Sequence, residues 1–457
     1  MLIRVKPPEV KYAVGKGSSI EYSELSDIGR RRSNNQDSKE VLPPSNSQQY
    51  RQRGWLFLVA DGMGAHAAGE MASAMAAQRV PLVYEKHASR SPPYSLRFAI
   101  EEVNREINTK GENNPDFRGM GTTCTTLAIV PRGAIVGHVG DSRCYRIRGT
   151  KVEQISRDHS LVWELESAGG MTREQANQSA PKNIITRSMG PHPKVDVDLE
   201  GPLPVELSDT FVLCSDGLSG QVSDEEIGLL ASLLTPKMAT RALVGLTLVR
   251  GSPDNVTVIV ARAGVEQVTA VSSSDAPWPM SEPVKSDETT KSSPWIAVGV
   301  SLVSLFFALI LQSSDVQQNL PAIPAGSPFW TIASLIMVAI SLGSGLVASI
   351  SWSTGPVDNG RFLPVGGRLG KGPYRDYDCT PTSALFNGII SSVDEIVSGL
   401  DANDQTQIAS LMLDARKKVE NSAFQEAMMP LCDALEIYYK AIERSRGSET
   451  THGSSAN

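Results

Sequence analysis

The sequence contains few cysteines, and their spacing forms no recognisable motif. The five thiols include no C-x-x-C pair and are widely separated, at Cys124, Cys144, Cys214, Cys379 and Cys432. An odd number at such spacing argues against a disulfide framework and against a zinc knuckle. We therefore expect reduced thiols, as in a cytoplasmic protein.

Long basic runs and an export signal are also missing. The chain carries 43 Lys and Arg against 50 Asp and Glu, so its net charge is −7 and nucleic acid is not an expected partner. The first residues, MLIRVKPPEVKYAVG, place prolines and charges where a signal peptide needs about 7 to 15 apolar residues. No secretory signal is expected.

Residues 20–265 have the pattern of one globular unit after an N-terminal extension, residues 1–19. Runs rich in β-branched and aromatic residues predict strands at 55–60, 123–130, 134–139, 210–214 and 255–261. Helices are predicted at 69–86 and 94–110, the second from apolar residues at helical spacing. Strands and helices occur in blocks rather than in strict alternation, which favours an α+β fold over a doubly wound parallel sheet.

Two apolar blocks follow a polar linker at 266–293. The blocks 295–311 and 329–352 contain no charged residue and have 17 and 24 residues, against the roughly 20 that cross a bilayer. They predict two transmembrane helices within 294–353. Two buried core helices are one alternative, and a single span at 329–352 with the shorter block in the membrane interface is another.

The charges that flank these blocks predict an orientation. The loop 312–328 contains no Lys or Arg, whereas Lys285 and Lys291 precede the first block and Arg361, Arg368 and Lys371 follow the second. By the positive-inside rule both ends of the hairpin are cytoplasmic. Beyond it we expect a Gly-rich connector at 354–379, a helical module at 380–446 and a disordered tail at 447–457.

Aspartates recur beside the ends of the predicted strands. The run FLVADGMG stops at Asp61-Gly62, and a second run, TFVLC, stops at Ser215-Asp216-Gly217. Three further aspartates have similar settings, namely Asp37 in a polar stretch, Asp141 after a strand and Asp254 before one. A single Asp-Gly is most simply a turn, but five such aspartates predict converging carboxylates that bind Mg²⁺ or Mn²⁺.

A phosphate-binding glycine loop is a weaker interpretation of the same stretch. GMGAHAAG meets the dinucleotide pattern only with Ala67 in the third glycine position, and no Gly-Lys-Ser/Thr follows as in a Walker loop. A nucleotide-binding enzyme therefore stays an alternative with little support. His66 could be a ligand, although an oxygen-rich site does not require it.

Seven ordered segments resemble the motifs of the protein phosphatase 2C family, the metal-dependent protein Ser/Thr phosphatases, in their bacterial form. They lie within residues 20–265 and are SDIGRRRSNNQD (26–37), VADGMGAHAAGEMAS (59–73), GMGTT (119–123), GHVGDSRCYRI (137–147), DHS (158–160), CSDGLS (214–219) and PDNVTVIV (253–260). The resemblance implies a sandwich of two antiparallel β-sheets flanked by helices, with a binuclear metal site at one edge.

The resemblance also assigns roles to individual residues. The metal pair, Mn²⁺ or Mg²⁺, would be held by Asp37, Asp61, Asp216 and Asp254 with the backbone carbonyl of Gly62, and Asp141 would bind a third ion. Arg32 would clamp the phosphate, for which a planar guanidinium is well suited. Residues 161–186 fall where the family carries a mobile flap.

Three positions depart from the family pattern. Gln36 stands where many members have Glu, Met63 where eukaryotic members have a His proposed as general acid, and Ala65 replaces a glycine. We expect altered metal affinity from Gln36, and the identity of the general acid stays open.

The function implied is that of a membrane-anchored phosphatase acting on phosphoserine and phosphothreonine in proteins. Its substrates would be targets of Ser/Thr kinases, and its location the inner membrane, with the phosphatase domain and the C-terminus in the cytoplasm. The alternative is a catalytically silent module that binds phosphoproteins or metal as a sensor at the membrane.

Overall fold

The chain forms two units, one of which interrupts the other. The computed structural model describes residues 20–64, 67–169, 184–264, 275–281, 294–313, 327–353 and 362–453, with a few single residues between these ranges. Contacts group residues 1–280 with 363–457 and separate residues 281–362. The first unit is therefore discontinuous in sequence. The extension 1–19, most of the linker 266–293, residues 354–361 and the tail from 454 lie outside the described residues.

The first sheet of the discontinuous unit combines strands from both parts of the chain. All neighbouring strands are antiparallel. Their order is β1 (Ile20–Asp27), β11 (Val256–Ala263), β10 (Thr210–Cys214), β7 (Arg143–Arg148), β8 (Lys151–Gln154) and β14 (Arg375–Asp378). Every residue of β10 is buried, as expected for a strand covered on both faces. The edge strand β14 comes from beyond the insertion.

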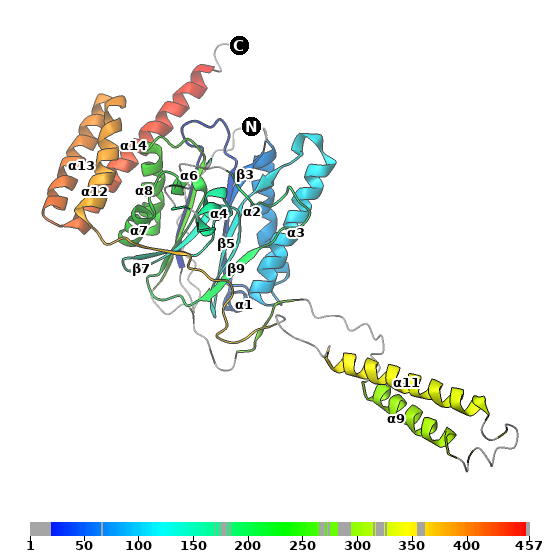
Figure 1. Ribbon diagram of the computed structural model, residues 1–457. Helices are drawn as coiled ribbons and strands as arrows, with labels where there is room; N and C mark the ends of the chain where they lie inside the picture. The colour runs from blue at the N-terminus through cyan, green and yellow to red at the C-terminus, as the bar shows by residue number, and fades with distance from the viewer. Residues whose placement is uncertain are drawn as a thin grey trace. The chain divides into compact units, whose positions relative to one another are not determined.

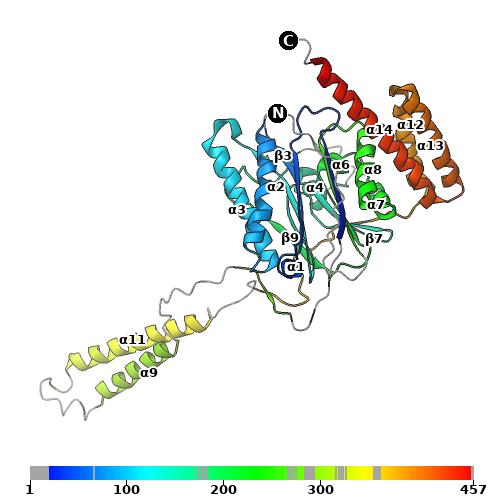
Figure 2. The ribbon, with the colours of Figure 1, turned by 180° about the vertical axis from the view of Figure 1, so that it is seen from behind.

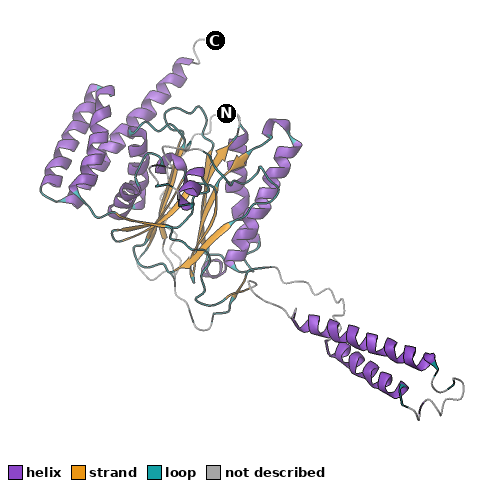
Figure 3. Cartoon of the chain, viewed as in Figure 1, coloured by secondary structure: helices purple, strands orange, loops and turns teal. Residues whose placement is uncertain are grey.

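The second sheet packs face to face with the first. It has the order β2 (Asp37–Leu42), β3 (Trp55–Met63), β5 (Cys124–Val130), β6 (Gly133–Val139) and β9 (Asp198–Leu203), with β4 (Gly121–Thr122) paired to the end of β3. Apolar residues of both sheets, among them Trp55, Phe57 and Phe211, form one buried cluster between them. Figure 3 shows the strands as two layers between helices.

Long helices cover the outer faces of the sandwich. Helices α2 (Ala68–Lys86) and α3 (Pro92–Asn113) pack on the second sheet, and α7 (Asp224–Leu233) and α8 (Pro236–Val249) on the first. Figures 1 and 2 show these two helical layers from opposite sides. Shorter helices are α1 (Ser47–Gln52), α4 (Leu161–Ser167) and α6 (Asp216–Ser219). The predicted α+β sandwich is confirmed.

The C-terminal helices extend the layer on the first sheet. Helices α12 (Ser383–Ile396), α13 (Ala402–Glu420) and α14 (Phe424–Gly453) share one apolar cluster with α7, α8 and the strands beneath them. Gly245 of α8 faces α14 so closely that a Cβ there would lie 3.2 Å from the Cβ of Leu435. The helices predicted at 380–446 are present, and their apolar residues share the cluster on the outer face of the first sheet with α7 and α8.

The inserted unit consists of two helices that pack against each other, α9 (Pro294–Leu311) and α11 (Pro328–Ser353). The Ser301 hydroxyl donates to the Ser341 carbonyl at 2.9 Å. Large apolar side chains elsewhere on the helices are exposed, including Leu302, Phe306, Leu309, Leu335 and Leu342. Within the part of the chain that is described, we find no helix with the length and apolar character that a membrane crossing requires.

Candidate active site

Asp37 and Asp61 lie opposite each other on neighbouring strands. Asp37 opens β2, and the antiparallel register of β2 and β3 pairs its Cα with that of Asp61. The hydroxyl of Ser215 donates to Oδ2 of Asp37 at 2.7 Å. Oδ1 of Asp37 is buried and has no hydrogen-bond partner among the described residues. A buried, unpaired carboxylate oxygen of this kind is suited to bind a cation.

Asp61 and Gly62 are part of a strand rather than a turn. Both lie within β3, where the Asp61 amide donates to Oγ1 of Thr123 at 2.8 Å and the Gly62 amide donates to the Gln36 carbonyl at 3.1 Å. A Cβ on Gly62 would lie 2.1 Å from the carbonyl oxygen of Gly69. Glycine is therefore required at this position because the backbone of Gly69 lies too close for a side chain. Since Asp61 and Gly62 lie in a strand, the interpretation of this Asp-Gly as a turn is wrong.

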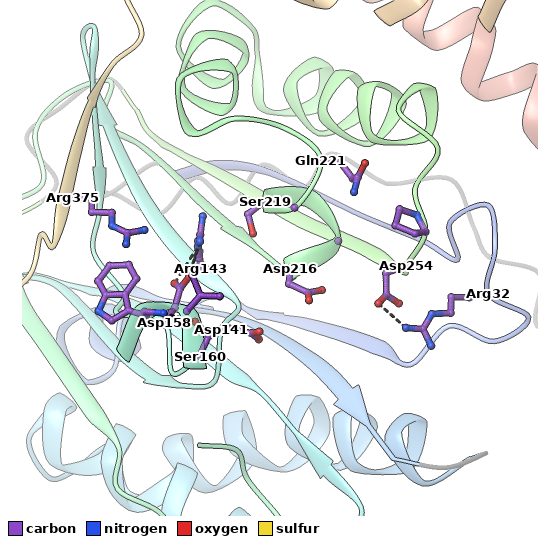
Figure 4. A pocket seen from close by; sticks show the side chains of 15 residues that line it. Arg32, Asp141, Arg143, Asp158, Ser160, Asp216, Ser219, Gln221, Asp254 and Arg375 are labelled. Carbon is purple, nitrogen blue, oxygen red and sulfur yellow. Dashed lines mark hydrogen bonds and ion pairs between the residues drawn. The ribbon is translucent and has the colours of Figure 1, made fainter. Parts of the chain in front are cut away.

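The other three predicted aspartates line one cavity together with Arg32. Asp141 follows β6, Asp216 begins α6 and Asp254 precedes β11. The cavity has a volume of about 430 Å³, and Figure 4 shows Asp141, Asp216 and Asp254 around it, with Arg32 at one end. Oδ1 of Asp141 is buried and lacks a hydrogen-bond partner within the described ranges.

Arg32 is held at the cavity by an ion pair and by the shape of its loop. Its Nη2 lies 2.7 Å from Oδ2 of Asp254, and 49% of its side chain is exposed. The side chain of Asn255 fixes the loop: it donates to the carbonyls of Ile28 and Asn34 at 2.8 and 2.9 Å and accepts from the Gln36 amide at 2.8 Å. Apart from the position of Asn255 next to Asp254, no sequence pattern predicts this role.

The carboxylates of the site repel one another. Burial raises the pKa of Asp37, Asp61, Asp141 and Asp216, and the charges of neighbouring aspartates raise it further. The hydrogen bond with Asp254 raises the pKa of Arg32. Negative charge thus exceeds positive charge at this edge of the sandwich, so a divalent cation would relieve the repulsion.

The donor chemistry fits Mg²⁺ or Mn²⁺, because both ions prefer oxygen ligands. Two of the aspartates, moreover, have a buried oxygen without a hydrogen-bond partner in the described chain. Among the described residues, however, no three acidic, histidine or cysteine side chains come close enough to hold one ion as they stand. Asp254 is also engaged by Arg32. Binding of one ion by several of these side chains would therefore require them to move closer together.

The turn that carries Asp141 is stabilised by a hydrogen bond to His159. The Gly140 amide donates to Nδ1 of His159 at 2.9 Å, so Nε2 carries the proton and donates to Oδ2 of Asp198 at 2.9 Å. Gly140 has φ +115, and a Cβ there would lie 2.5 Å from a methyl group of Thr123. These contacts give the DHS segment a structural role that the sequence did not define.

One arginine with two ion pairs lines the cavity beside Asp141. Arg143, whose side chain is 11% exposed, lies 2.6 Å from Asp158 and 3.2 Å from Asp224, linking β7, the DHS segment and α7. Of the predicted flap, 161–186, the structure describes α4 and residues 184–186, with gaps between them. Met63 ends β3 and pairs with Gly121, whereas Ala65 and His66 lie outside the described residues.

Comparison with known proteins places this site in a family. The family model described as protein phosphatase 2C matches residues 29–244. A serine/threonine phosphatase, stp, of Listeria monocytogenes is 35% identical over 248 residues, which are 53% of this chain and 95% of the relative. The protein phosphatase PhpP of Streptococcus pneumoniae is 36% identical over 251 residues, 54% of this chain and 99% of the relative.

A longer relative and one solved structure match the same region. The serine/threonine protein phosphatase PstP of Mycobacterium tuberculosis is 35% identical over 247 residues, 53% of this chain and 45% of the relative. The solved catalytic domain of a PstP in complex with two manganese ions is 33% identical, with a TM-score of 0.46, and the match covers 54% of this chain and 99% of that one. The chain belongs to the protein phosphatase 2C family of serine/threonine phosphatases.

Proposed function

We propose that the chain hydrolyses phosphoserine and phosphothreonine esters in proteins with the help of divalent metal ions. The observation that carries the proposal is the convergence of three aspartates and Arg32 on one cavity, beside the Asp37 and Asp61 pair. A phosphate monoester needs cationic groups around its oxygens and a positioned water for hydrolysis. The carboxylates at this edge of the sandwich would hold the cationic groups, and the cavity has room for the water.

The proposed metal ligands are aspartates whose carboxylates lie close to one another. Asp37, Asp61, Asp216 and Asp254, with the carbonyl of Gly62, would hold two ions, and Asp141 a third. Mn²⁺ or Mg²⁺ bound there would supply positive charge for the phosphoryl oxygens and would lower the pKa of a bound water toward neutrality. The Ser215 hydroxyl orients Asp37, and the Thr123 hydroxyl holds the backbone beneath Asp61.

Arg32 would bind the phosphoryl oxygens of the substrate. Its guanidinium presents a planar pair of donors, which suits two oxygens of one phosphate. In the structure the same guanidinium pairs with Asp254. A metal ion held by Asp254 would compete with this ion pair and would leave Arg32 available for the substrate.

A cysteine nucleophile does not fit this site. Cys214 ends β10, two residues before Asp216, and is fully buried. Burial raises the pKa of its thiol to about 12, so it stays protonated at neutral pH and is a poor nucleophile. Direct attack by water is therefore the mechanism that we propose, without a covalent intermediate on the enzyme.

A turnover assay tests the proposal against a silent phosphoprotein-binding module. The full chain should release phosphate from a phosphothreonine peptide with Mn²⁺, lose this activity in EDTA and regain it when Mn²⁺ is restored. Cys214→Ala should behave like the wild type. Peptide binding without phosphate release at saturating Mn²⁺ would favour the silent module, and activity that survives EDTA would overturn the metal assignment.

We further propose that the inserted hairpin anchors the enzyme to the inner membrane, close to substrates phosphorylated by Ser/Thr kinases. The support is the absence of charge from 295–311 and 329–352 and the exposed apolar side chains on α9 and α11. The short strands β12 (Trp278–Pro279) and β13 (Phe362–Leu363) pair with each other on either side of the insertion. Any membrane crossing by the insert must then occur an even number of times.

Reporter fusions test this topology. A reporter active only in the cytoplasm should work after Ser445, and one active only in the periplasm should work at Asn319. Charge supports this orientation, since Lys285 and Lys291 precede the hairpin while the loop 312–328 has no Lys or Arg. Activity of the periplasmic reporter after Ser445 would favour a single span. If the untagged chain is found in the fraction from which membranes have been removed, anchoring is contradicted.

A further inference from the structure

A strand from beyond the insertion forms part of the wall of the active-site cavity. Strand β14 pairs with β8 at the edge of the first sheet, with Arg375 opposite Gln154 and Asp378 opposite Lys151. This register brings Arg375 to the cavity that also contains Asp216 and Asp141. Figure 4 shows Arg375 and Arg32 at opposite ends of the cavity.

Arg375 is bound to helix α4 by two contacts. Its guanidinium lies 3.7 Å from the centre of the Trp163 ring and forms an ion pair with Glu166. Only 15% of the Arg375 side chain is exposed. A planar guanidinium can stack on an aromatic ring and pair with a carboxylate at the same time. A lysine could not make both contacts in this geometry.

Helix α4 is short and is also held at its start, where the Leu161 amide donates to the Ile184 carbonyl at 2.9 Å and Ser160 bridges to Ile185. It has seven residues, of which Trp163 is the buried one, and its N-cap Ser160 accepts from the Trp163 amide. The neighbouring Tyr374 meets the Trp163 ring edge-on at 6.2 Å and donates to Glu200 at 2.7 Å. Trp163 is therefore the side chain through which α4 is buried, and its ring is covered by Arg375 of β14 and by Tyr374 just before it.

We propose that Arg375 is a positioning residue that holds α4 as a wall for the peptide around the phosphorylated residue. A protein substrate is longer than its phosphate group, and its flanking residues must lie along the cavity away from Arg32. A small aryl phosphate occupies only the end with Arg32 and Asp216. Loss of Arg375 should then weaken the binding of peptides and spare small substrates.

Kinetics of full-chain variants test this role, which rests on the proposed phosphatase activity. Arg375→Ala should raise KM for a phosphothreonine peptide about tenfold, with kcat and the kinetics on p-nitrophenyl phosphate near those of the wild type. Arg375→Lys should recover only part of the loss. The matched control is Asp376→Asn, at the exposed neighbouring position on β14. This variant should have wild-type kcat and KM on both substrates.

A charge exchange and a measurement without turnover separate this role from general damage. The double variant Arg375→Glu with Glu166→Arg should bind peptide better than Arg375→Glu alone. Amide hydrogen exchange in α4 should become faster in Arg375→Ala while β10 stays protected. Equal losses on both substrates, or unchanged α4 exchange, would overturn the inference. An inactive wild type with faster α4 exchange in the variant would reject the phosphatase proposal and keep the positioning role.

Discussion

At the scale of single residues, the site gathers carboxylates that are costly to bury together. Asp37 and Asp141 each keep a buried oxygen without a hydrogen-bond partner in the described part of the chain. Such groups destabilise a fold unless a cation compensates for them. If these residues bind metal as proposed, a bound cation would stabilise the fold.

We expect Asp216→Asn to lower kcat on a phosphothreonine peptide by about 100-fold or more at saturating Mn²⁺, because it removes one ligand charge from the site. The amide has nearly the same shape as the carboxylate, so circular dichroism should be unchanged. Asp141→Ala should reduce kcat less, since a third ion would be held less firmly. Equal and complete inactivation by both changes would contradict this order.

A buried histidine should make stability depend on pH. Burial and the charge of nearby His159 lower the pKa of His138 from 6.5 to about 3. The unfolded chain thus takes up the proton first as the pH falls. The stabilising contribution is complete above about pH 6.5 and is lost as the pH falls toward 3, by at most about 1.4 kcal/mol per pH unit.

Urea unfolding between pH 7.5 and 4.5 measures this effect. The variant His138→Gln can keep hydrogen bonds to the Thr125 hydroxyl and the Arg157 carbonyl, which lie 2.9 Å from the histidine ring. Its free energy of unfolding should fall less steeply over this range than that of the wild type. Parallel slopes for the two proteins would show that His138 does not carry the titration.

The sequence pattern predicted the candidate site residues, but it did not predict the residues that hold them in place. Asp61, Asp216 and Asp141 follow apolar runs, so the pattern of strand and carboxylate identifies them. Asn255 and Arg375 act through contacts with residues more than 200 positions away, and no local pattern encodes such contacts. Whether the five aspartates bind metal stays a prediction.

At the scale of elements, the strands that were predicted are those with continuous apolar runs. The buried strands β3, β5, β6, β10 and β11 match the predicted ranges within a few residues. Strands β2 (DSKEVL), β7 (RCYRIR) and β14 (RDYD) were missed because charged residues dominate them. Their pairing depends on neighbours that are distant in sequence, which periodicity does not show.

The shared core of α8 and α14 gives a prediction for the C-terminal helices. Leu435 of α14 is fully buried against α8 near Gly245. Leu435→Ala should lower the free energy of unfolding by about 2–5 kcal/mol, because it leaves a cavity in this core. Activity and helical signal should be lost together in one urea transition. A separate early transition that leaves activity intact would show that α14 folds on its own.

At the scale of the whole molecule, the phosphatase unit is interrupted rather than followed by its hairpin. Strands β12 and β13 pair with each other although residues 280–361 separate them in sequence, and β14 and α12–α14 complete the first sheet and its outer cluster. Sequence composition located the apolar blocks but suggested a linear order of domains. The return of the chain to the sheet could not be read from composition, because it depends on the pairing of β14 with β8.

Two deletions should therefore have opposite outcomes. Replacing residues 282–361 by a short Gly-Ser linker should leave a soluble, active enzyme, because paired strands lie only about 4.8 Å apart and a short linker can join them. Ending the chain after Val265 should yield aggregated, inactive protein, since the apolar surface of α8 loses its cover. Solubility and turnover of both chains check this, and an active chain ending at Val265 would refute it.

The interruption also sets an order of events during synthesis. Strand β14 and the C-terminal helices leave the ribosome after the hairpin, so the last strand of the sheet is the last to arrive. At 5–20 residues per second, the chain between the end of β11 and the end of α14 takes roughly 10 to 40 s to make. The hairpin, which ends at Ser353, is complete for about the second half of that interval, while the C-terminal helices are still being made. The insert therefore meets its surroundings before the enzyme can act.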